Sequence, residues 1–308
     1  MIIDSHTDVL WKMIKDPTID FYSDSEKLNV NYPNMVAGNI NVQIFAIFVS
    51  ALKTAKFSYA IQSVDDFYQK ILDSKKLNLA LNYKQIEKLL NENKKVALLS
   101  LEGADALEGD LGKLRIFHKL GVRAVGLTWN FSNEAADGIL EKRGAGLTEF
   151  GYQLIKELNK LGMMIDLSHI SVRGFWDVLE TSESPVMASH SNSKYICNHP
   201  RNLADDQIKA IIKTGGIIGV TYVKQFVADK KNPSIEDLLL HIEHIAELGG
   251  INNIGLGSDF DGGLLIKELN NPALLDNLIN LLGKKFNDRD VEAILGGNWL
   301  RHFRRILK

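Results

Sequence analysis

The chain opens with a short apolar run that ends in ionisable side chains, MIIDSHTD (residues 1–8). Residues two apart in an extended strand point to the same side, so His6 and Asp8 can face one place. A lone histidine at a strand end is more often a satisfied structural residue than a metal ligand. The pair therefore gains meaning only if other strands of the chain end in the same kind of residue.

Seven further apolar runs follow, and amphipathic helical patterns separate them. The runs are continuous and not alternating, as expected of parallel strands that helices cover on both faces. Eight strands with helices between them predict a (β/α)8 TIM barrel, a single α/β domain over residues 1–308. A doubly wound sheet is the alternative, but no glycine-rich fingerprint follows an early strand. The later strands are expected at 41–50, 96–103, 122–129, 163–169, 185–190, 216–222 and 254–260, and helices at 63–74, 83–94, 148–162 and 203–216.

The predicted strands end in side chains that bind metals or move protons. Their carboxyl ends converge on one face of a barrel, and burying each such group alone would cost several kcal/mol. We therefore expect them to surround a cation. These residues are His6, Asp8, Glu102, His169, His190 and Asp259.

Imidazoles and carboxylates without thiolates favour Zn²⁺, or Mn, Fe or Co, at an open catalytic site. Three histidines and two carboxylates exceed the needs of one tetrahedral site, but they suffice for two metals if one carboxylate bridges. Glu102 lies between the first pair and the two later histidines, and it is the natural bridge. Asp166 is expected either to orient the His169 ring or to make a structural hydrogen bond.

Composition narrows the class of protein. The 308 residues are 45% hydrophobic and 24% charged, with a net charge of -2 and no basic block, which argues against nucleic-acid binding. The apolar runs are too short to cross a membrane. A single cysteine, Cys197, excludes an internal disulfide. With no signal-peptide pattern at the start, we expect a cytoplasmic protein.

Two other segments carry expectations. The connection 11–40 is rich in Asn, Asp, Tyr and Pro, and in a barrel it would hang over the carboxyl-end face as a candidate cover. The last segment, 297–308, has the pattern of an amphipathic helix with a solvated basic face.

Motifs along the whole chain resemble those of the membrane dipeptidases (the renal dipeptidase family, peptidase family M19), which are amidohydrolase-like metal-dependent barrels. The resemblance implies that His6, Asp8 and Glu102 hold one zinc, and that Glu102, His169 and His190 hold the second. The motifs are DSHTD, NVNYPNMVAGNINVQIFAIFV, SLEGADAL, GLTWNFSNEAADG, DLSHIS, ASHSNSKYICNHPRNLADDQI, GLGSDFDGG and GGNWLR.

The resemblance also assigns roles around the substrate. Arg201 matches the position that grips the substrate carboxylate, a task that suits its planar fork. Asp259 matches the acid that handles the proton near the leaving amine. Trp129 stands where some members carry a histidine, so the oxyanion donor is open, with Asn130 and the metals as candidates. Tyr222, at the end of a predicted strand, completes the candidate substrate contacts.

These observations predict a binuclear zinc dipeptidase that cleaves L-Xaa-L/D-Xaa through a metal-bridging hydroxide, with Glu102 and Asp259 as catalytic residues. Other divalent metals would suit the same ligands. The expected partner is a small dipeptide, with no nucleic acid and no membrane, and a homodimer is left open. The first alternative is a barrel amidohydrolase acting on N-acyl amino acids or other small amides; many of these use a carboxylated lysine where this chain has Glu102. The second is a non-catalytic barrel, against which the presence of Asp259 argues.

Overall fold

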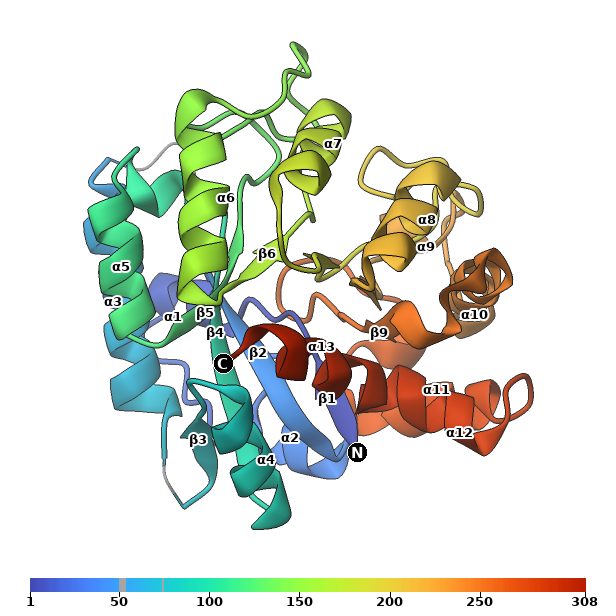
Figure 1. The fold of residues 1–308 in the computed structure, drawn as a ribbon. Helices are drawn as coiled ribbons and strands as arrows, with labels where there is room; N and C mark the ends of the chain where they lie inside the picture. Colours follow the sequence, from blue (N-terminus) through green and yellow to red (C-terminus); the bar gives the residue numbers. More distant parts are fainter. Residues whose placement is uncertain (50–53, 74) are drawn as a thin grey trace.

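The structure, a computed structural model, describes residues 1–49, 54–73 and 75–308. Eight parallel strands close into a barrel, because β1 pairs with both β2 and β9, and β2 pairs in turn with β4 (Figure 1). The predicted TIM barrel is confirmed. Its strands are β1 (Ile2–Asp4), β2 (Ile40–Phe48), β4 (Lys95–Glu102), β5 (Val122–Gly126), β6 (Met164–Asp166), β7 (Met187–Ala188), β8 (Ile217–Val220) and β9 (Ile254–Leu256).

One further strand was not predicted. β3 (Leu77–Leu79) pairs with the start of β4, with Leu77 opposite Lys95. β5 pairs with β4 only from Leu99 onward, so β3 extends the sheet outside the closed barrel. A three-residue strand is too short to show a period in the sequence. The last residue of the predicted strand 41–50 lies outside the described residues.

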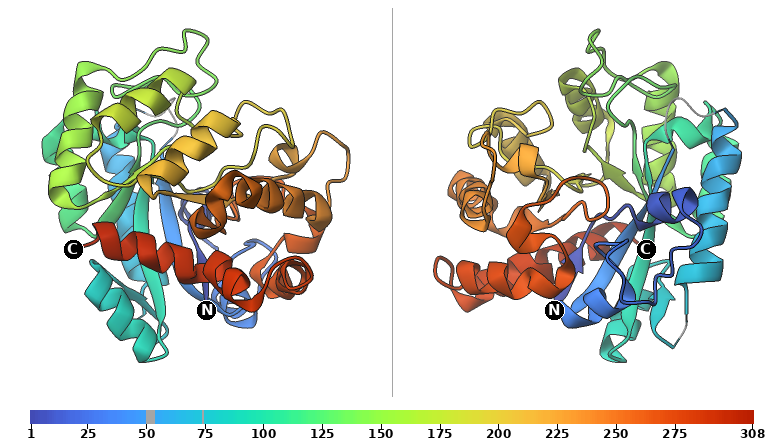
Figure 2. Two further views of the ribbon diagram at one scale, coloured as in Figure 1. Left: turned by 45° about the vertical axis from the view of Figure 1, so that its right-hand side comes forward. Right: turned by 180° about the vertical axis from the view of Figure 1, so that it is seen from behind.

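Helices surround the barrel on the outside (Figure 2). Polar side chains begin several of them, since Asn82, Thr148 and Ser171 each accept a hydrogen bond from a backbone N–H of the first turn. The α-helices are α1 (Val9–Lys15), α2 (Tyr32–Ala37), α3 (Lys56–Asp66), α4 (Tyr83–Asn91), α5 (Leu111–Lys119), α6 (Glu149–Leu161), α7 (Val172–Thr181), α8 (Asp205–Thr214), α9 (Lys224–Val227), α10 (Ile235–Ile245), α11 (Leu275–Leu282), α12 (Asp288–Glu292) and α13 (Asn298–Ile306).

Short π and 3-10 segments complete the helical structure. The predicted helix 63–74 begins earlier, as α3, and ends in a π turn at Phe67–Ile71; residue 74 lies outside the described residues. The predicted helices 83–94, 148–162 and 203–216 are confirmed as α4, α6 and α8. The other π segments are Ala246–Gly250 and Ala293–Gly297, and the 3-10 segments are Ala104–Leu107, Ile251–Asn253, Lys267–Leu269 and Pro272–Leu274.

Helix α13 closes the amino end of the barrel, which it crosses as the dark red helix in Figure 2. Trp299 is fully buried against the residues that fill the barrel, and its Nε1 donates to Leu256 O at 3.1 Å. A Cβ on Gly255 would lie 2.1 Å from that nitrogen, so only glycine leaves room for the indole. The predicted final helix is confirmed. Its apolar face, which we call the plug, covers the amino end of the barrel.

The connection after β1 does not cover the mouth as predicted. Its later part, α2, lies at the opposite end of the barrel, where Lys95 Nζ at the start of β4 donates to Met35 O and Ile40 O. Its first part stays at the carboxyl ends of the strands, where Trp11 lines the cavity. Asn29 and Val30 also donate backbone N–H bonds to Asp261 in the loop after β9. The apolar residues of this connection, Phe21 and Val30, are buried in the core, which explains its path down the barrel.

No helix in the described ranges combines the length and the apolar character that a bilayer crossing requires.

Candidate active site

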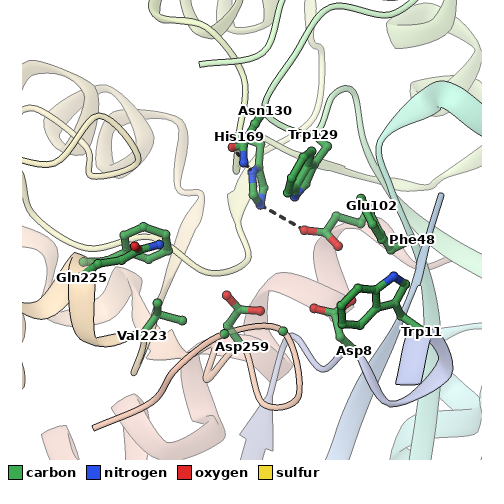
Figure 3. A pocket seen from close by; sticks show the side chains of 13 residues that line it. Asp8, Trp11, Phe48, Glu102, Trp129, Asn130, His169, Val223, Gln225 and Asp259 are labelled. Atoms are coloured by element: carbon green, nitrogen blue, oxygen red, sulfur yellow. Dashed lines mark hydrogen bonds and ion pairs between the residues drawn. The ribbon is translucent and has the colours of Figure 1, made fainter. Parts of the chain in front are cut away.

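A cavity of about 160 Å³ opens at the carboxyl ends of the strands. Figure 3 shows Asp8, Glu102, His169 and Asp259 pointing toward one another around its centre. They follow or end four different strands, β1, β4, β6 and β9, as the barrel geometry requires. The structure therefore brings together residues that are up to 251 positions apart in the sequence (259 minus 8).

The two sides of the cavity differ in character. Trp11, Phe48 and Trp129 form one side, with ring centroids 6.2 Å apart between Trp11 and Phe48 and 5.2 Å between Phe48 and Trp129. Val223 and Gln225 lie opposite (Figure 3). We refer to Trp11, Phe48 and Trp129 as the aromatic wall.

Glu102 lies between the three histidines. Its Oε1 is 3.0 Å from His169 Nε2 and 3.7 Å from His190 Nε2, while its Oε2 is 3.8 Å from His6 Nε2. The two carboxylate oxygens thus face different histidines. This is the position that a bridging carboxylate needs, although the bridging role itself stays a prediction.

Asp8 and Asp259 complete the cluster on the side of His6. His6 Nε2 lies 3.6 Å from Asp8 Oδ2 and 3.9 Å from Asp259 Oδ1. Two sets of three donor atoms each fit within 4.8 Å: His6, Glu102 and His190, and His6, Asp8 and Asp259. Asp259 therefore stands close enough to act either on substrate or as a further ligand. Gly262 makes this approach possible, since a Cβ there would lie 2.2 Å from an oxygen of each aspartate.

The buried donor atoms have the character of a metal site. His169 Nδ1 lies 2.8 Å from Asn130 Oδ1 and therefore donates its proton there, which leaves the Nε2 lone pair free. That Nε2 faces His190 Nε2 at 2.8 Å and the Glu102 carboxylate. Among the described residues, His6 Nε2 and Asp8 Oδ1 are buried with no hydrogen-bond partner. A cation would satisfy all of these atoms, so the donor set fits divalent metal.

The pKa values of the clustered side chains also favour a bound cation. Burial raises the pKa of Glu102 well above its ordinary value, and the charge of Asp8 raises it further. Burial likewise raises the pKa of Asp259 to about 7. Burial alone would lower the pKa of His6, but Glu102 and Asp8 outweigh it and raise the pKa to about 10. A bound cation would take over the charge that a proton on His6 otherwise supplies.

His169 and His190 are held neutral. Burial lowers the pKa of both imidazoles well below the ordinary value; Arg201 adds to the effect at His169, and His6 adds to it at His190. Neutral imidazole is the form that ligates metal.

The backbone at the site is strained at two non-glycine residues. His169 has a φ of 71° and Asp259 a φ of 63°, both in the left-handed region. Such a conformation costs about 1–2 kcal/mol in a residue with a Cβ. Both residues lie just beyond a strand, where the backbone turns away and the side chain points into the mouth of the barrel. Strained residues of this kind cluster at functional sites.

Arg201 lies beside the site and not in the main cavity wall. It is 5% exposed, and its Nη2 donates to His190 O at 3.3 Å. Within the described part of the chain its buried Nε has no hydrogen-bond partner. It borders a smaller cavity of about 20 Å³ that also touches His169. Burial lowers its pKa to about 10, so it stays charged at neutral pH.

Of the three remaining predicted substrate contacts, two line the cavity and one does not. Trp129 and Asn130 line the cavity. Tyr222 does not; it is 1% exposed and packs edge-on against Phe260 at 5.7 Å between ring centroids. The structure places it in the core, where its aromatic body fills space behind the β9 loop, so its predicted contact with substrate has no geometric support.

Sequence reasoning missed two groups of residues that line the cavity. Trp11 and Phe48 line the mouth, although Phe48 fell within a predicted strand and Trp11 directly follows the His6–Asp8 pair. Gln225 and Phe226 come from the short helix α9, which carried no signal. For Asp166, the second of the two expectations holds, because its carboxylate makes structural hydrogen bonds with Ser168 and Ser189.

Comparison with known proteins places this site in a family. The family model of the membrane dipeptidases, peptidase family M19, matches residues 1–308. The chain belongs to peptidase family M19. The predictions of the family and of a metal-dependent dipeptidase-type enzyme are thereby confirmed. This M19 chain is also 37% identical, over 243 residues, to the uncharacterized protein in the pqqA 5′ region of Klebsiella pneumoniae, covering 75% of this chain and 89% of that one.

Solved structures share its fold. A metallo-dipeptidase of family M19 superposes with a TM-score of 0.92 at 24% identity, covering 99% of this chain and 98% of that one. A Rhodobacter sphaeroides metallopeptidase, liganded with a phosphinate mimic of L-Ala-D-Ala, gives 0.92 at 23% identity, covering 99% of both chains. A probable dipeptidase from Pseudomonas aeruginosa gives 0.88 at 20% identity, covering 99% of this M19 chain and 96% of that one.

Proposed function

We propose that the protein hydrolyses dipeptides at a binuclear zinc centre. The observation that carries this proposal is the placement of Glu102 between His6 on one side and His169 and His190 on the other. Membership of family M19 supports the choice of a dipeptide as substrate. The Rhodobacter sphaeroides structure, which holds a dipeptide mimic on the same fold, supports it as well.

The residues divide into two ligand sets. His6, Asp8 and Glu102 would hold one zinc ion, and Glu102, His169 and His190 the other. When bound, the two ions supply Lewis acidity that activates water and polarises the amide carbonyl. The nitrogen and oxygen donors would also accept other divalent metals such as manganese or cobalt.

Asp259 would move the proton. Its carboxyl lies at the centre of the cavity, 9% exposed, and in the metal-free site burial raises its pKa to about 7. It accepts a proton from the attacking water and delivers it to the departing amine, so one group serves as base and then as acid.

The substrate ends would be recognised on opposite sides. Arg201, with its unused Nε among the described residues, would pair with the free carboxylate of the second residue. It stacks over Phe226, 5.4 Å from the ring, and Phe226 lines the cavity. The first residue would then face the aromatic wall. Because recognition rests on a carboxylate, we expect either an L or a D second residue to be accepted.

The small cavity supports a short substrate. The aromatic wall on one side and Val223 and Gln225 on the other limit the width of the cavity. A peptide with more residues beyond the scissile bond would also lack a free carboxylate at Arg201. Asn130 and the metals are the candidates to stabilise the oxyanion of the reaction. Asn130 Oδ1 accepts a hydrogen bond from His169, so its amide nitrogen is the group that would donate to the oxyanion.

Metal content and a substrate panel test the proposal. Protein loaded with zinc and freed of excess metal should hold two ions per chain by elemental analysis. It should cleave L-Xaa-L-Xaa and L-Xaa-D-Xaa dipeptides faster than the matched N-acetyl amino acids. Cleavage of N-acyl amino acids alone would instead assign the chain to the amidohydrolase alternative. Absence of bound metal would overturn the metal centre, and absence of turnover by loaded protein would indicate a binding module.

A further inference from the structure

Two buried aspartates make the same set of hydrogen bonds at two places in the barrel. Asp166, the last residue of β6, accepts from Ser168 N at 3.0 Å. It also accepts from the backbone N–H of Ser189 at 2.8 Å and from the Ser189 hydroxyl at 2.5 Å. Ser189 directly follows the neighbouring strand β7. All three contacts require the Asp166 carboxylate to be the acceptor.

Asp4 repeats this arrangement at the last residue of β1. It accepts from His6 N at 3.4 Å, from Ser258 N at 2.9 Å and from the Ser258 hydroxyl at 2.5 Å. Ser258 lies just beyond the neighbouring strand β9. In both places an aspartate ties its own strand end to a serine on the next strand, and all four side chains are buried.

The two serines differ in what else they touch. Ser258 Oγ reaches only backbone groups beyond Asp4, His6 O and Phe260 N, each at 3.2 Å, among the contacts of the described chain. Ser189 Oγ lies 2.7 Å from Nδ1 of His190, a candidate metal ligand, and at a longer 3.4 Å from the Ser168 hydroxyl. Of the two aspartate–serine pairs, the Asp166–Ser189 pair is the one connected to an imidazole.

The direction of this chain of hydrogen bonds follows from proton count. A serine hydroxyl carries one hydrogen, and Ser189 gives it to the Asp166 carboxylate, which can only accept. The serine oxygen must therefore accept from His190, so Nδ1 of His190 carries the imidazole proton. Its Nε2 then presents a lone pair toward Glu102 and His169.

We propose that Asp166, acting through Ser189, is a positioning residue that sets the His190 tautomer and thereby keeps Nε2 available to metal. The inference rests on the proposed function in one respect, that His190 ligates zinc. It concerns residues that touch neither substrate nor reacting atoms. In the wrong tautomer the Nε2 hydrogen would occupy the direction in which a metal must bind.

Asp166→Asn is the sharpest variant because it reverses the chain of hydrogen bonds. The amide oxygen can keep the two backbone bonds, while the amide nitrogen takes the place next to Ser189 and donates to it. The Ser189 hydroxyl then turns to donate to His190 Nδ1, and the proton moves to Nε2. We expect Zn²⁺ affinity, measured by competition with a chelator, to fall about 100-fold.

Ser189→Ala removes the link without reversing it, so both tautomers remain accessible and we expect about a tenfold loss of Zn²⁺ affinity. Ser258→Ala is the matched control. It deletes the corresponding hydroxyl from the Asp4 pair and should leave Zn²⁺ affinity within about threefold of wild type. Equal losses in Ser189→Ala and Ser258→Ala would overturn the inference, because both would then act through the fold. If Asp166→Asn does not fold, this comparison between the two serine variants still decides.

Nitrogen NMR of metal-free protein labelled in its histidine rings gives a readout that a structural role would not change. His190 should be protonated at Nδ1 in the wild type and in Ser258→Ala, and at Nε2 in Asp166→Asn. An unchanged tautomer in Asp166→Asn overturns the inference. A wild type that binds no Zn²⁺ defeats the proposed metal centre instead, and the NMR result still decides the tautomer.

Discussion

The two ends of one barrel are built on opposite principles. At the carboxyl end the strands are followed by buried ionisable groups, and His169 and Asp259 hold strained left-handed backbone. At the amino end, the same strands contribute Ile3, Val42 and Val96 to an apolar cluster that Trp299 and Phe303 of α13 complete. The difference shows that within a few residues of one strand the role changes from stabilising the fold to carrying chemistry.

From this contrast we expect substitutions at the two ends of the barrel to have different effects. Changes at the carboxyl end should remove metal or activity while leaving the metal-free fold in place. Burying those ionisable groups costs folding free energy, so the metal-free fold does not depend on them. Changes at the amino end should lower the free energy of unfolding while leaving metal binding in place.

Glu102→Gln should have the largest effect. It keeps the side-chain volume but removes the carboxylate that faces all three histidines, so zinc content should fall below one ion per chain and kcat by roughly 10³-fold or more. Elemental analysis and dipeptide turnover measure both. The metal-free variant should unfold within about 1 kcal/mol of metal-free wild type. A variant that unfolds much more readily would break the contrast by giving this end a structural role.

Asp259→Asn should lower kcat about 10²- to 10⁴-fold, because the amide cannot carry the proton from water to amine. Zinc content should stay at the wild-type value, which elemental analysis of the same sample checks. Loss of one zinc ion along with activity would make Asp259 a ligand, consistent with its place near His6 and Asp8, and would contradict its role as proton carrier.

Trp299→Ala tests the amino end. The indole is fully buried and donates to Leu256 O, so its loss should destabilise the protein by about 3–5 kcal/mol. Denaturant unfolding of the metal-free variant measures this, and Ile279→Ala on the half-buried face of α11 serves as a milder control. The folded fraction should bind Zn²⁺ with wild-type affinity. A weakened zinc site would show that the plug also shapes the mouth.

His302→Leu should give the smallest effect, and only in acid. Burial lowers the pKa of His302 to about 3, and among the described residues neither ring nitrogen has a hydrogen-bond partner. The unfolded chain takes up this proton below about pH 6.5. The wild type therefore loses stability as the pH falls from about 6.5 toward 3, by about 2 kcal/mol at pH 5.

The leucine variant should lack that share of the acid sensitivity while matching the slope at neutral pH. Urea unfolding at pH 7.5 and pH 5 measures it in metal-free protein. Equal acid losses in variant and wild type would mean that His302 is charged in the folded state, and that the amino end tolerates charge after all.

The contrast also explains what the sequence could predict. Strand ends are visible because an apolar run stops at His6, Glu102, His169, His190 and Asp259, and parallel strands bring their ends together whatever the details of packing. The barrel is confirmed, and these side chains do converge. The ligand roles themselves stay predictions.

What escaped prediction depends on contacts between distant segments. Trp11 and Phe48 become neighbours of Trp129 only in the closed barrel, and β3 forms only because β4 offers a free edge. Tyr222 ends a strand as the ligands do, yet its side chain packs into the core. Asp166 is two residues before Ser168 and three before His169, but its partner across the sheet, Ser189, has no mark in the sequence.

The closure of the barrel between its first and last strands sets the order in which the site can form. β1 meets β9 through a single ladder pair, Asp4 with Leu256, and beyond it Asp8 N donates to Phe260 O. On the ribosome, β1 is synthesised before β9 and cannot gain that neighbour until residues 254–260 have been made. Such long-range pairing slows folding and leaves an open strand edge exposed. The part of the mouth where Asp8 and Asp259 meet therefore takes its final shape only after β9 has been synthesised.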